Sequence, residues 1–474
     1  MYIFAIKHFV DSDIFVIFEL KMKQMNTTVF KRKIYSKILQ WKTNSSGKTA
    51  LLIEGARRIG KSTIVEEFAK NEYESYLLLD FTKASKDVIN LFDDLSDLQF
   101  FFLSLQSLTG VKLQPGKSCI IFDEVQFCPK ARQAIKHLVK DGRYDYIETG
   151  SLISIKKNIK DILIPSEERR IEMFSMDFEE FLWAIGKENT FDLIRYSFEY
   201  LRPLGDGVNR QLMRLFRLYI LVGGMPQSVS EYLNSSNFES VDAVKRDILN
   251  LYIEDFEKID NKGRAANIFK SIPSELARNT LKYRVGDVIA NARISRLSEI
   301  FGDIHKSMTV NFAYHSNDPG VGFALHANPD NFKMFLADTG LFISLAFMER
   351  DFTENIIYRK LLSDKLPTDL GYVFENVVAQ LLRTSGNSLY YYTFKEEDNS
   401  EKQTKSYEID FMISRKDKIC PIEVKSSGYK THKSLDKFQQ KFSSRISQRY
   451  LLYTKDIRKE KDIICLPVYM TGLL

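Results

Sequence analysis

The stretch Leu51-Leu52-Ile53-Glu54-Gly55-Ala56-Arg57-Arg58-Ile59-Gly60-Lys61-Ser62-Thr63 decides the fold of the first part of the chain. An apolar run that suits a buried strand leads into the pattern GxxxxGK[ST], and a segment with apolar residues at helical spacing follows. The two glycines allow backbone dihedrals that other residues resist, so the loop amides can point inward at phosphate oxygens. The sequence therefore predicts a phosphate-binding loop between a strand and a helix.

Each residue of this loop has an expected role toward a purine nucleoside triphosphate. The residues that would surround the phosphates are Gly55, Ala56, Arg57, Arg58, Ile59, Gly60, Lys61, Ser62 and Thr63. The Lys61 ammonium would reach the β and γ phosphates, and the Ser62 hydroxyl would ligate Mg²⁺. We predict ATP and Mg²⁺ as the bound cofactors. A chance Gly-Lys-Ser in a loop is the alternative, and the flanking strand and helix disfavour it.

Three further apolar runs, at 76–79, 119–122 and 146–149, alternate with helical patterns and predict an α/β fold with a parallel sheet covered on both faces. The middle run ends in Asp123 and Glu124. At the tip of a buried strand, Asp123 would hold Mg²⁺ and Glu124 would polarise the attacking water as general base.

The last of these runs ends in Thr149-Gly150-Ser151. Parallel strands deliver their carboxyl ends to one crevice, so Thr149 or Ser151 could sense the γ phosphate, with a plain turn as the alternative. Arg169 and Arg170 are candidates for an arginine finger, but the sequence does not assign one.

Length and composition limit the remaining possibilities. The chain has 474 residues, a net charge of +6 and a pI of about 8.8, which permits a nucleic-acid partner without demanding one. Its four cysteines lack CxxC spacing, which argues against a zinc site or a disulfide framework. No apolar stretch approaches the roughly 18 residues of a membrane span. We expect a cytoplasmic protein without a membrane partner, in which residues 1–24 form a dispensable extension.

A second set of charged residues lies near the end of the sequence. Glu375 falls in a helical pattern, Asp410 on a predicted strand, and Glu423 and Lys425 on the next strand. Residues two apart on a strand point to one face, so Glu423 and Lys425 can lie beside Asp410. Carboxylates from Glu375, Asp410 and Glu423 could bind Mg²⁺ and activate water, while Lys425 stabilises charge on a phosphodiester. The alternative is an edge hairpin with solvated charges.

The middle of the chain is mostly helical. A break at Gly223-Gly224-Met225-Pro226 interrupts the helical pattern of residues 173–261. Residues 262–350 contain short helical patterns and two predicted strands, at 309–314 and 322–325, joined by a turn; this outlines a helix-turn-helix with a wing. Its basic residues Arg293, Arg296 and Lys306 could contact DNA, whereas a plain helical connector is the alternative. The charged segment 395–405 is predicted to be a mobile insertion.

Together these motifs resemble a group of prokaryotic AAA-type P-loop ATPases that carry a C-terminal domain of unknown function. The shared signatures are Gly55-Ala56-Arg57-Arg58-Ile59-Gly60-Lys61-Ser62, Asp123-Glu124-Val125-Gln126, Thr149-Gly150-Ser151, Met176-Asp177-Phe178-Glu179-Glu180-Phe181-Leu182, Val222-Gly223-Gly224-Met225-Pro226, Phe335-Leu336-Ala337-Asp338-Thr339-Gly340-Leu341 and Phe374-Glu375-Asn376. The resemblance extends from about Met25 to the C-terminus.

The resemblance implies four domains. These are an ATPase core (25–172), a helical lid (173–261), a winged-helix segment (262–350) and an α/β domain similar to the restriction-endonuclease-like PD-(D/E)xK nuclease fold (351–474). In that last domain Asp410, Glu423 and Lys425 match the nuclease motif, and Glu375 matches the helical acid. Similarity of fold does not establish cleavage.

Two functions from different classes follow from these observations. The first is an ATP-hydrolysing switch, a P-loop ATPase that governs a nuclease-like, DNA-directed C-terminal module. The second is a nucleotide-gated DNA- or protein-binding regulator with little turnover and no nuclease activity. ATP, a nucleic acid such as DNA and further copies of the chain are the expected partners.

Overall fold

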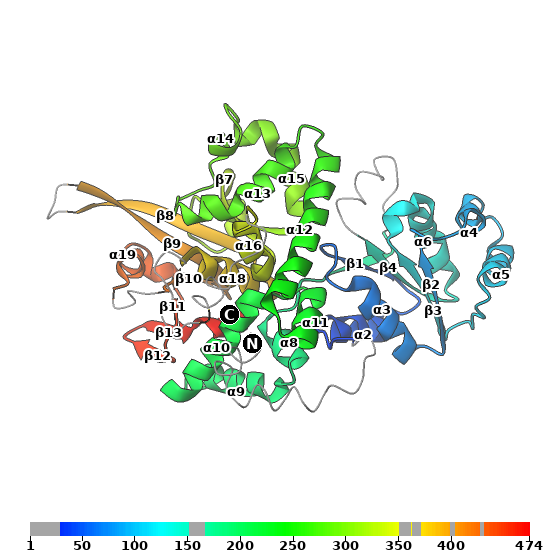
Figure 1. Cartoon of the computed structure of the whole chain (residues 1–474), viewed down its shortest axis with the longest axis horizontal. Helices are drawn as coiled ribbons and strands as arrows, with labels where there is room; N and C mark the ends of the chain where they lie inside the picture. The colour runs from blue at the N-terminus through cyan, green and yellow to red at the C-terminus, as the bar shows by residue number, and fades with distance from the viewer. Residues whose placement is uncertain (1–28, 151–165, 350–361, 363–370, 399–402, 427–430) are drawn as a thin grey trace, which may run out of the picture.

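Two β-sheets organise the chain, and the long helix α12 (Phe238–Ile259) stands between them (Figure 1). The computed structural model describes residues 29–150, 166–349, 362, 371–398, 403–426 and 431–474. The predicted extension at 1–24 and the candidate sensor Ser151 lie outside these residues. Within the described residues, no helix combines the length and the apolar character needed to cross a bilayer.

The first sheet is the predicted parallel sheet. Its order is β2-β3-β4-β1-β5, from β1 (Ala50–Glu54), β2 (Ser75–Asp80), β3 (Ser118–Asp123), β4 (Asp145–Gly150) and β5 (Glu168–Glu172), and all neighbours are parallel. The first four strands contain the four predicted apolar runs. The sequence does not predict β5, because the charged segment Glu-Arg-Arg-Ile-Glu lacks an apolar run, and it forms the sheet edge beside β1.

Helices cover both faces of this sheet. On one face lie α2 (Ile34–Ser45) and α3 (Lys61–Glu72), and on the other α4 (Lys86–Asn90), α5 (Leu98–Thr109) and α6 (Pro129–Asp141). In β3, Ile121 belongs to the first core, whereas Ile120 and Phe122 belong to the second. Successive strand residues point to opposite faces, so one strand supplies both cores. The predicted α/β class with a doubly covered parallel sheet is confirmed for this part of the chain.

The helical middle has the predicted break. Its helices are α8 (Phe178–Ala184), α9 (Glu188–Glu199), α10 (Asp206–Val222), α11 (Pro226–Ser235), α12, α13 (Arg264–Ala277), α14 (Val285–Val288) and α15 (Ser298–Lys306). Gly223 ends α10 with φ of +81°, a conformation that favours glycine, and Pro226 opens α11.

The second sheet has eight strands in the order β12-β13-β11-β10-β9-β8-β6-β7. They are β6 (Val310–Ser316), β7 (Ala327–Leu336), β8 (Leu389–Asp398), β9 (Gln403–Arg415), β10 (Lys418–Val424), β11 (Arg449–Tyr453), β12 (Arg458–Glu460) and β13 (Ile463–Pro467). The helices α16 (Thr339–Ala346), α18 (Gly371–Thr384) and α19 (Lys433–Phe442) accompany it.

The two strands predicted for a wing are the hairpin β6–β7, with one correction. Residues 322–325 are not a strand: they form the short 3-10 turn Phe323–Leu325, and β7 starts at Ala327. Gly322, with φ of +87°, turns the chain before the strand can start. Because β6 also pairs in parallel with β8, the sheet runs continuously across the predicted domain boundary at 350/351. The hairpin is therefore the edge of a larger sheet and not a separate wing.

The charged segment 395–405, predicted to be a mobile insertion, is strand in its described part. β8 and β9 pair antiparallel from Tyr390 to Asp398, opposite Gln403. Opposite charges help this pairing, because Glu396 lies across from Lys405 and its carboxylate also contacts Lys437 of α19 at 3.1 Å. Figure 1 shows the two strands as a ribbon that extends well beyond the body of the molecule.

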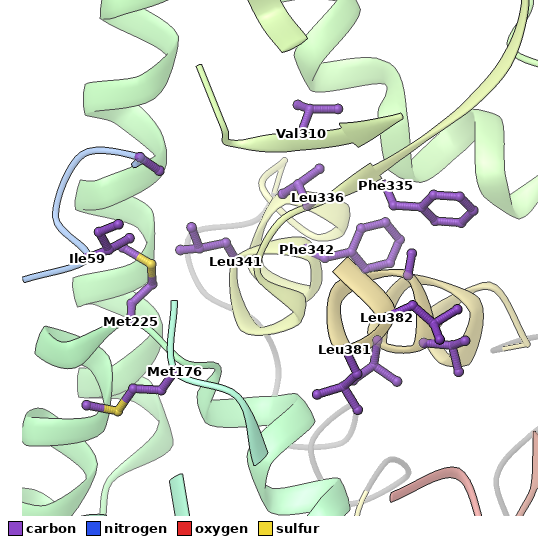
Figure 2. Close-up of a cluster of buried hydrophobic side chains, with 14 of the residues drawn as sticks. Ile59, Met176, Met225, Val310, Phe335, Leu336, Leu341, Phe342, Leu381 and Leu382 are labelled. Atoms are coloured by element: carbon purple, nitrogen blue, oxygen red, sulfur yellow. The ribbon is translucent and has the colours of Figure 1, made fainter. Parts of the chain in front are cut away.

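One hydrophobic core joins the phosphate loop to the second half of the chain. It includes Ile59 of the loop, Met225 before α11, Leu341 of α16 and Leu381 of α18. Figure 2 shows Ile59 and Met225 together, with Leu341 directed toward them from the neighbouring helix. All four cysteines are free and buried, as expected for reduced thiols.

Candidate functional site

The phosphate loop has the backbone shape that its glycines allow. Arg58 and Gly60 have φ of +69° and +91°. A Cβ added at Gly55 would lie 2.5 Å from the carbonyl oxygen of Met173, which approaches because its amide donates to Glu54 O at 2.8 Å. A side chain at position 55 would therefore displace the backbone after β5. The arginine side chains at 57 and 58 and Thr63 are exposed, whereas Ala56 and Ile59 are buried.

Lys61 opens α3 and is almost fully buried. Its Nζ donates to the carbonyl oxygens of Gly55 at 2.9 Å and Ala56 at 2.8 Å, inside the curve of the loop. Burial lowers the pKa of Lys61 to about 8, while the carboxylates of Glu124 and Asp123 act in the opposite direction. A bound phosphate would supply the negative charge that favours the ammonium form, so the side chain is poised for an anion.

Asp123, at the carboxyl end of β3, accepts hydrogen bonds from two hydroxyl groups. Its Oδ1 accepts a hydrogen bond from Ser62 Oγ at 2.7 Å and another from Thr149 Oγ1 at the tip of β4. The parallel sheet explains this convergence, because the carboxyl ends of its strands meet at one edge. A serine hydroxyl and a carboxylate are the hard oxygen ligands that Mg²⁺ prefers, so the residues present fit this ion.

Glu124 follows directly and adopts an unusual backbone. Its φ of +53° and ψ of +49° are left-handed, a conformation that costs a non-glycine residue roughly 1 kcal/mol or more. Its amide donates to Thr149 Oγ1 at 3.3 Å, and its carboxylate accepts from Gln126 Nε2. The amide contact fixes the main chain of Glu124 at the tip of β3, and its carboxylate acts electrostatically on Lys61.

Two residues that the sequence did not single out support the loop from outside. Arg32 Nη1 donates to Ile59 O at 2.9 Å, and the Tyr252 hydroxyl of α12 donates to Arg57 O at 2.7 Å. The Arg57 guanidinium also meets Asp255 of α12 at 3.2 Å. Neither Arg32 nor Tyr252 lies in a local motif, so only the folded contacts reveal them. The finger candidate Arg170 lies on β5 and is paired with Glu168 at 2.8 Å.

Behind the loop lies a tight junction between α10, α11 and α16. Asp338 caps α16 by accepting from Leu341 N at 3.0 Å, and it accepts from Gly224 N at 2.7 Å. A Cβ at Gly224 would lie 2.0 Å from Met176 O, and one at Gly340 would lie 2.5 Å from Gly223 Cα. The signatures at 222–226 and 335–341 are thus explained by close backbone contact.

A second group of charged residues lies on the larger sheet. We call it the acidic cluster: Lys333 of β7, Glu375 of α18, Glu408 and Asp410 of β9, Glu423 of β10, and Lys425 directly after β10. Lys425 Nζ contacts Glu423 Oε1 at 2.8 Å, Lys333 Nζ contacts Glu408 Oε1 at 2.5 Å, and Asp410 Oδ2 accepts from Val424 N at 2.7 Å. The structure thus brings all four predicted residues to one region and adds Lys333 and Glu408.

Burial and mutual repulsion raise the pKa values of the carboxyl groups in this cluster. Burial raises the pKa of Glu375 to about 7, and the nearby Asp410 and Glu408 add to the shift. Burial likewise raises the pKa of Glu423 to about 7, with Asp410 adding to it. Burial alone would lower the pKa of Lys333, but the surrounding carboxylates outweigh it and raise that pKa. Glu375 and Glu423 therefore keep their protons up to about pH 7, and the cluster reaches an excess of negative charge only when they ionise.

The geometry does not form a ready metal site of three protein ligands. Among the described residues, no three acidic, histidine or cysteine side chains come close enough together to hold an ion. However, Glu423 Oε2 is buried and has no hydrogen-bond partner within those residues. The basic residues Arg293 and Arg296 are exposed around a 3-10 turn, and Lys306 lies at the end of α15.

Comparisons with known families divide the chain into three. Residues 47–182 match the model of an AAA domain, residues 213–351 that of a domain of unknown function (DUF8612), and residues 370–470 that of another (DUF4143). The first match indicates an AAA-type P-loop ATPase, in agreement with the parallel sheet and the phosphate loop. The predicted C-terminal domain of unknown function is also matched. No curated protein matches the chain.

Two solved structures are weakly similar to the chain. PCH-2 from C. elegans is 12% identical, with a TM-score of 0.26 over 48% of this chain and 67% of that one. A signal transduction ATPase with numerous domains, with a tetratricopeptide repeat sensor, from Pyrococcus horikoshii is 14% identical, with a TM-score of 0.25 over 75% of this chain and 46% of that one. Likenesses at these scores carry no argument about this chain.

Proposed function

We propose that this chain binds ATP with Mg²⁺ at the phosphate loop and hydrolyses it. The observation that carries the proposal is the meeting of the Ser62 and Thr149 hydroxyls on Asp123 Oδ1, beside the buried Lys61. These groups come from one loop and two strand tips, and together they form the polar end of an ATPase sheet.

The roles of the residues follow from their positions. Lys61 would release the loop carbonyls and bind the β and γ phosphates. Ser62 and Asp123 would hold Mg²⁺, which neutralises phosphate charge. Glu124 would accept the proton of the attacking water. Thr149 would position both acidic residues, because its hydroxyl donates to Asp123 Oδ1 and accepts from the Glu124 amide. Arg170 is already paired with Glu168, whereas Arg169, the other candidate for an arginine finger, is an exposed residue of the same strand.

The test is ATP binding and steady-state turnover by the full chain, with and without DNA. Lys61→Ala should abolish binding, whereas Lys70→Ala removes a surface lysine of the same helix that pairs with Glu66 and should leave it unchanged. Equal loss in both variants, or no loss in Lys61→Ala, would reject the loop as the nucleotide site. Stimulation by DNA would support nucleic acid as the partner that the ATPase serves.

We further propose that the acidic cluster is a nuclease-like hydrolytic site directed at a phosphodiester. Asp410 and Glu423 lie on neighbouring strands, Lys425 shares the face of Glu423, and Glu375 approaches from α18. Glu423 Oε2 is buried without a hydrogen-bond partner among the described residues, which supports a role for this oxygen as a cation ligand. Asp410 and Glu423 would bind Mg²⁺, Lys425 would stabilise phosphate charge, and the ion would supply activated water.

Cleavage of plasmid DNA with Mg²⁺ or Mn²⁺, in the presence and absence of ATP, tests this second part. Asp410→Asn should abolish cleavage. Asp417→Asn changes an exposed acid at the turn of the same hairpin and should have no effect. Cleavage that survives Asp410→Asn would point to a contaminating nuclease and against this site.

A nucleotide-gated DNA- or protein-binding regulator is the second candidate. It is favoured by the lack of a three-ligand metal group among the described residues and by the engagement of the Glu124 carboxylate with Gln126. It predicts ATP-dependent, salt-sensitive binding of DNA without cleavage and with little turnover. A cytoplasmic location and self-association belong to either proposal, and cell fractionation and light scattering with and without ATP would test them.

A further inference from the structure

Lys333 occupies an unexpected position for a strand lysine. Its side chain is 6% exposed, and its ammonium lies 2.5 Å from Glu408 Oε1 and 4.0 Å from Glu375 Oε2. It comes from β7, in the segment 213–351, whereas the carboxylates around it belong to the segment 370–470. The β6–β8 pairing joins these two parts of the chain into one sheet, and this brings the lysine into the acidic cluster.

The direct contacts of the cluster fall into two halves. In the first half, the Lys333 ammonium contacts the carboxylates of Glu375 and Glu408. In the second half, Lys425 binds one oxygen of Glu423, Asp410 accepts one backbone amide, and Glu423 Oε2 has no partner within the described residues. Fully ionised, the four carboxylates and two ammonium groups leave an excess of two negative charges, which a single divalent ion would neutralise.

We propose that Lys333 is a built-in counter-ion that takes the place of a second metal. The cluster would then accept one divalent ion, between Asp410 and Glu423. The Lys333 ammonium would neutralise the charge of Glu375 and Glu408. This inference rests on the proposed metal-binding role of the cluster and adds the number of ions that the cluster binds. A compact ammonium on a flexible stem suits such a role, since it is a point charge with three donors.

Mn²⁺ binding to the full chain without nucleotide, followed by electron paramagnetic resonance, tests the inference. The wild type should bind one ion at the cluster, identified by its loss in Asp410→Asn. Lys333→Met should bind a second ion, or bind the first about tenfold more tightly, because a positive charge a few ångströms away has been removed. Lys333→Arg keeps the charge and should behave like the wild type in the number of ions bound.

Thermal unfolding provides a second readout if Lys333→Met folds poorly. Removal of the ammonium leaves Glu375 and Glu408 buried without their cation, so the variant should be less stable and should regain stability with Mn²⁺. The rise in melting temperature with Mn²⁺ should exceed that of the wild type and should shrink in the double variant with Asp410→Asn.

The outcomes separate this inference from the proposed function. If the wild type binds one ion and Lys333→Met binds the same ion with the same affinity, the counter-ion role is wrong and the metal site stands. Weaker Mn²⁺ binding by Lys333→Met would also overturn the role, since it would make the lysine a support for the ligands. If neither protein binds Mn²⁺, both the inference and the hydrolytic role of the cluster fail.

Discussion

The Tyr252 hydroxyl donates a hydrogen bond to the carbonyl oxygen of Arg57 at 2.7 Å, so the long helix α12 holds the phosphate loop directly. The same helix reaches the second half of the chain through Asp242, which accepts a hydrogen bond from Ser344 of α16. Figure 1 shows α12 between the two sheets, with the loop on one side and α16 on the other. A change in the loop on nucleotide binding therefore has one continuous helix through which it can reach the larger sheet.

Tyr252→Phe should loosen the loop without removing any group that touches nucleotide. One hydrogen bond contributes about 0.5–1.5 kcal/mol, so ATP affinity should fall roughly two- to tenfold. Tyr232→Phe is the matched control, because this tyrosine of α11 makes no hydroxyl hydrogen bond with the described part of the chain. Fluorescent-nucleotide titration measures both, and equal affinities in the two variants would show that the contact does not hold the loop.

Lys61→Met should stabilise the chain without nucleotide while it abolishes ATP binding. The ammonium is buried and its pKa lies near 8 instead of 10.5, so below pH 8 its charge costs stability. The apolar side chain removes this cost but leaves two loop carbonyls unbonded, and we expect a net gain of about 1 kcal/mol. Urea unfolding at pH 7 measures it, and a clear loss of stability would mean that the lysine is well satisfied by the loop.

Gly224→Ala should destabilise the junction by about 3 kcal/mol, because the added methyl would lie 2.0 Å from the Met176 carbonyl oxygen. Gly207→Ala is the control: its Cβ meets no atom within 4 Å in α10, and alanine should add about 0.5–1 kcal/mol. Chemical unfolding of both variants tests the contrast. If position 224 tolerates alanine as well as position 207 does, the backbone contact is not tight.

Stability should fall as pH rises from about 4.5 to 7 because of the acidic cluster. The pKa of Glu423 rises from its ordinary 4.5 to about 7 on folding, so the folded state keeps a proton that the unfolded state has lost. The full penalty is present above pH 7, and at about 1.4 kcal/mol per pKa unit it amounts to at most roughly 3.5 kcal/mol.

Glu423→Gln isolates this effect from other groups, since burial also raises the pKa of Glu148, to about 8. The variant should show a smaller loss of melting temperature between pH 5 and pH 8 than the wild type. Divalent ions should reduce the wild-type loss, because they bind the ionised carboxylate. Parallel pH profiles of the two proteins would count against a protonated Glu423.

Local motifs predict the ATPase end of the molecule well. The glycines of the loop pattern predict the backbone conformation of the loop. The parallel sheet then brings Asp123 to Ser62, because the carboxyl ends of its strands meet at one edge. Contacts made across long stretches of chain are not predicted. Arg32 and Tyr252 reach loop carbonyls from helical and irregular segments without a motif of their own.

The acidic cluster shows the same limit. Glu408 could have been found, because it precedes Asp410 by two residues and a strand directs both to one face. Lys333 could not, since it lies in the apolar run 332–336 and meets its partners only through the β6–β8 pairing. The charged strand β5 and the charged ends of β8 and β9, at 395–398 and 403–405, were missed because charge suggests solvent. However, β5 is an edge strand, and the ends of β8 and β9 extend beyond the body of the molecule.

The most direct test of the central claim is steady-state hydrolysis of Mg²⁺·ATP by the wild type and Glu124→Gln, with ATP affinity measured on the same preparations. The account predicts that the variant binds ATP as the wild type does and turns it over at least about a hundredfold more slowly, because only the general base is lost. Equal turnover in the two proteins would contradict the assignment of hydrolysis to this site.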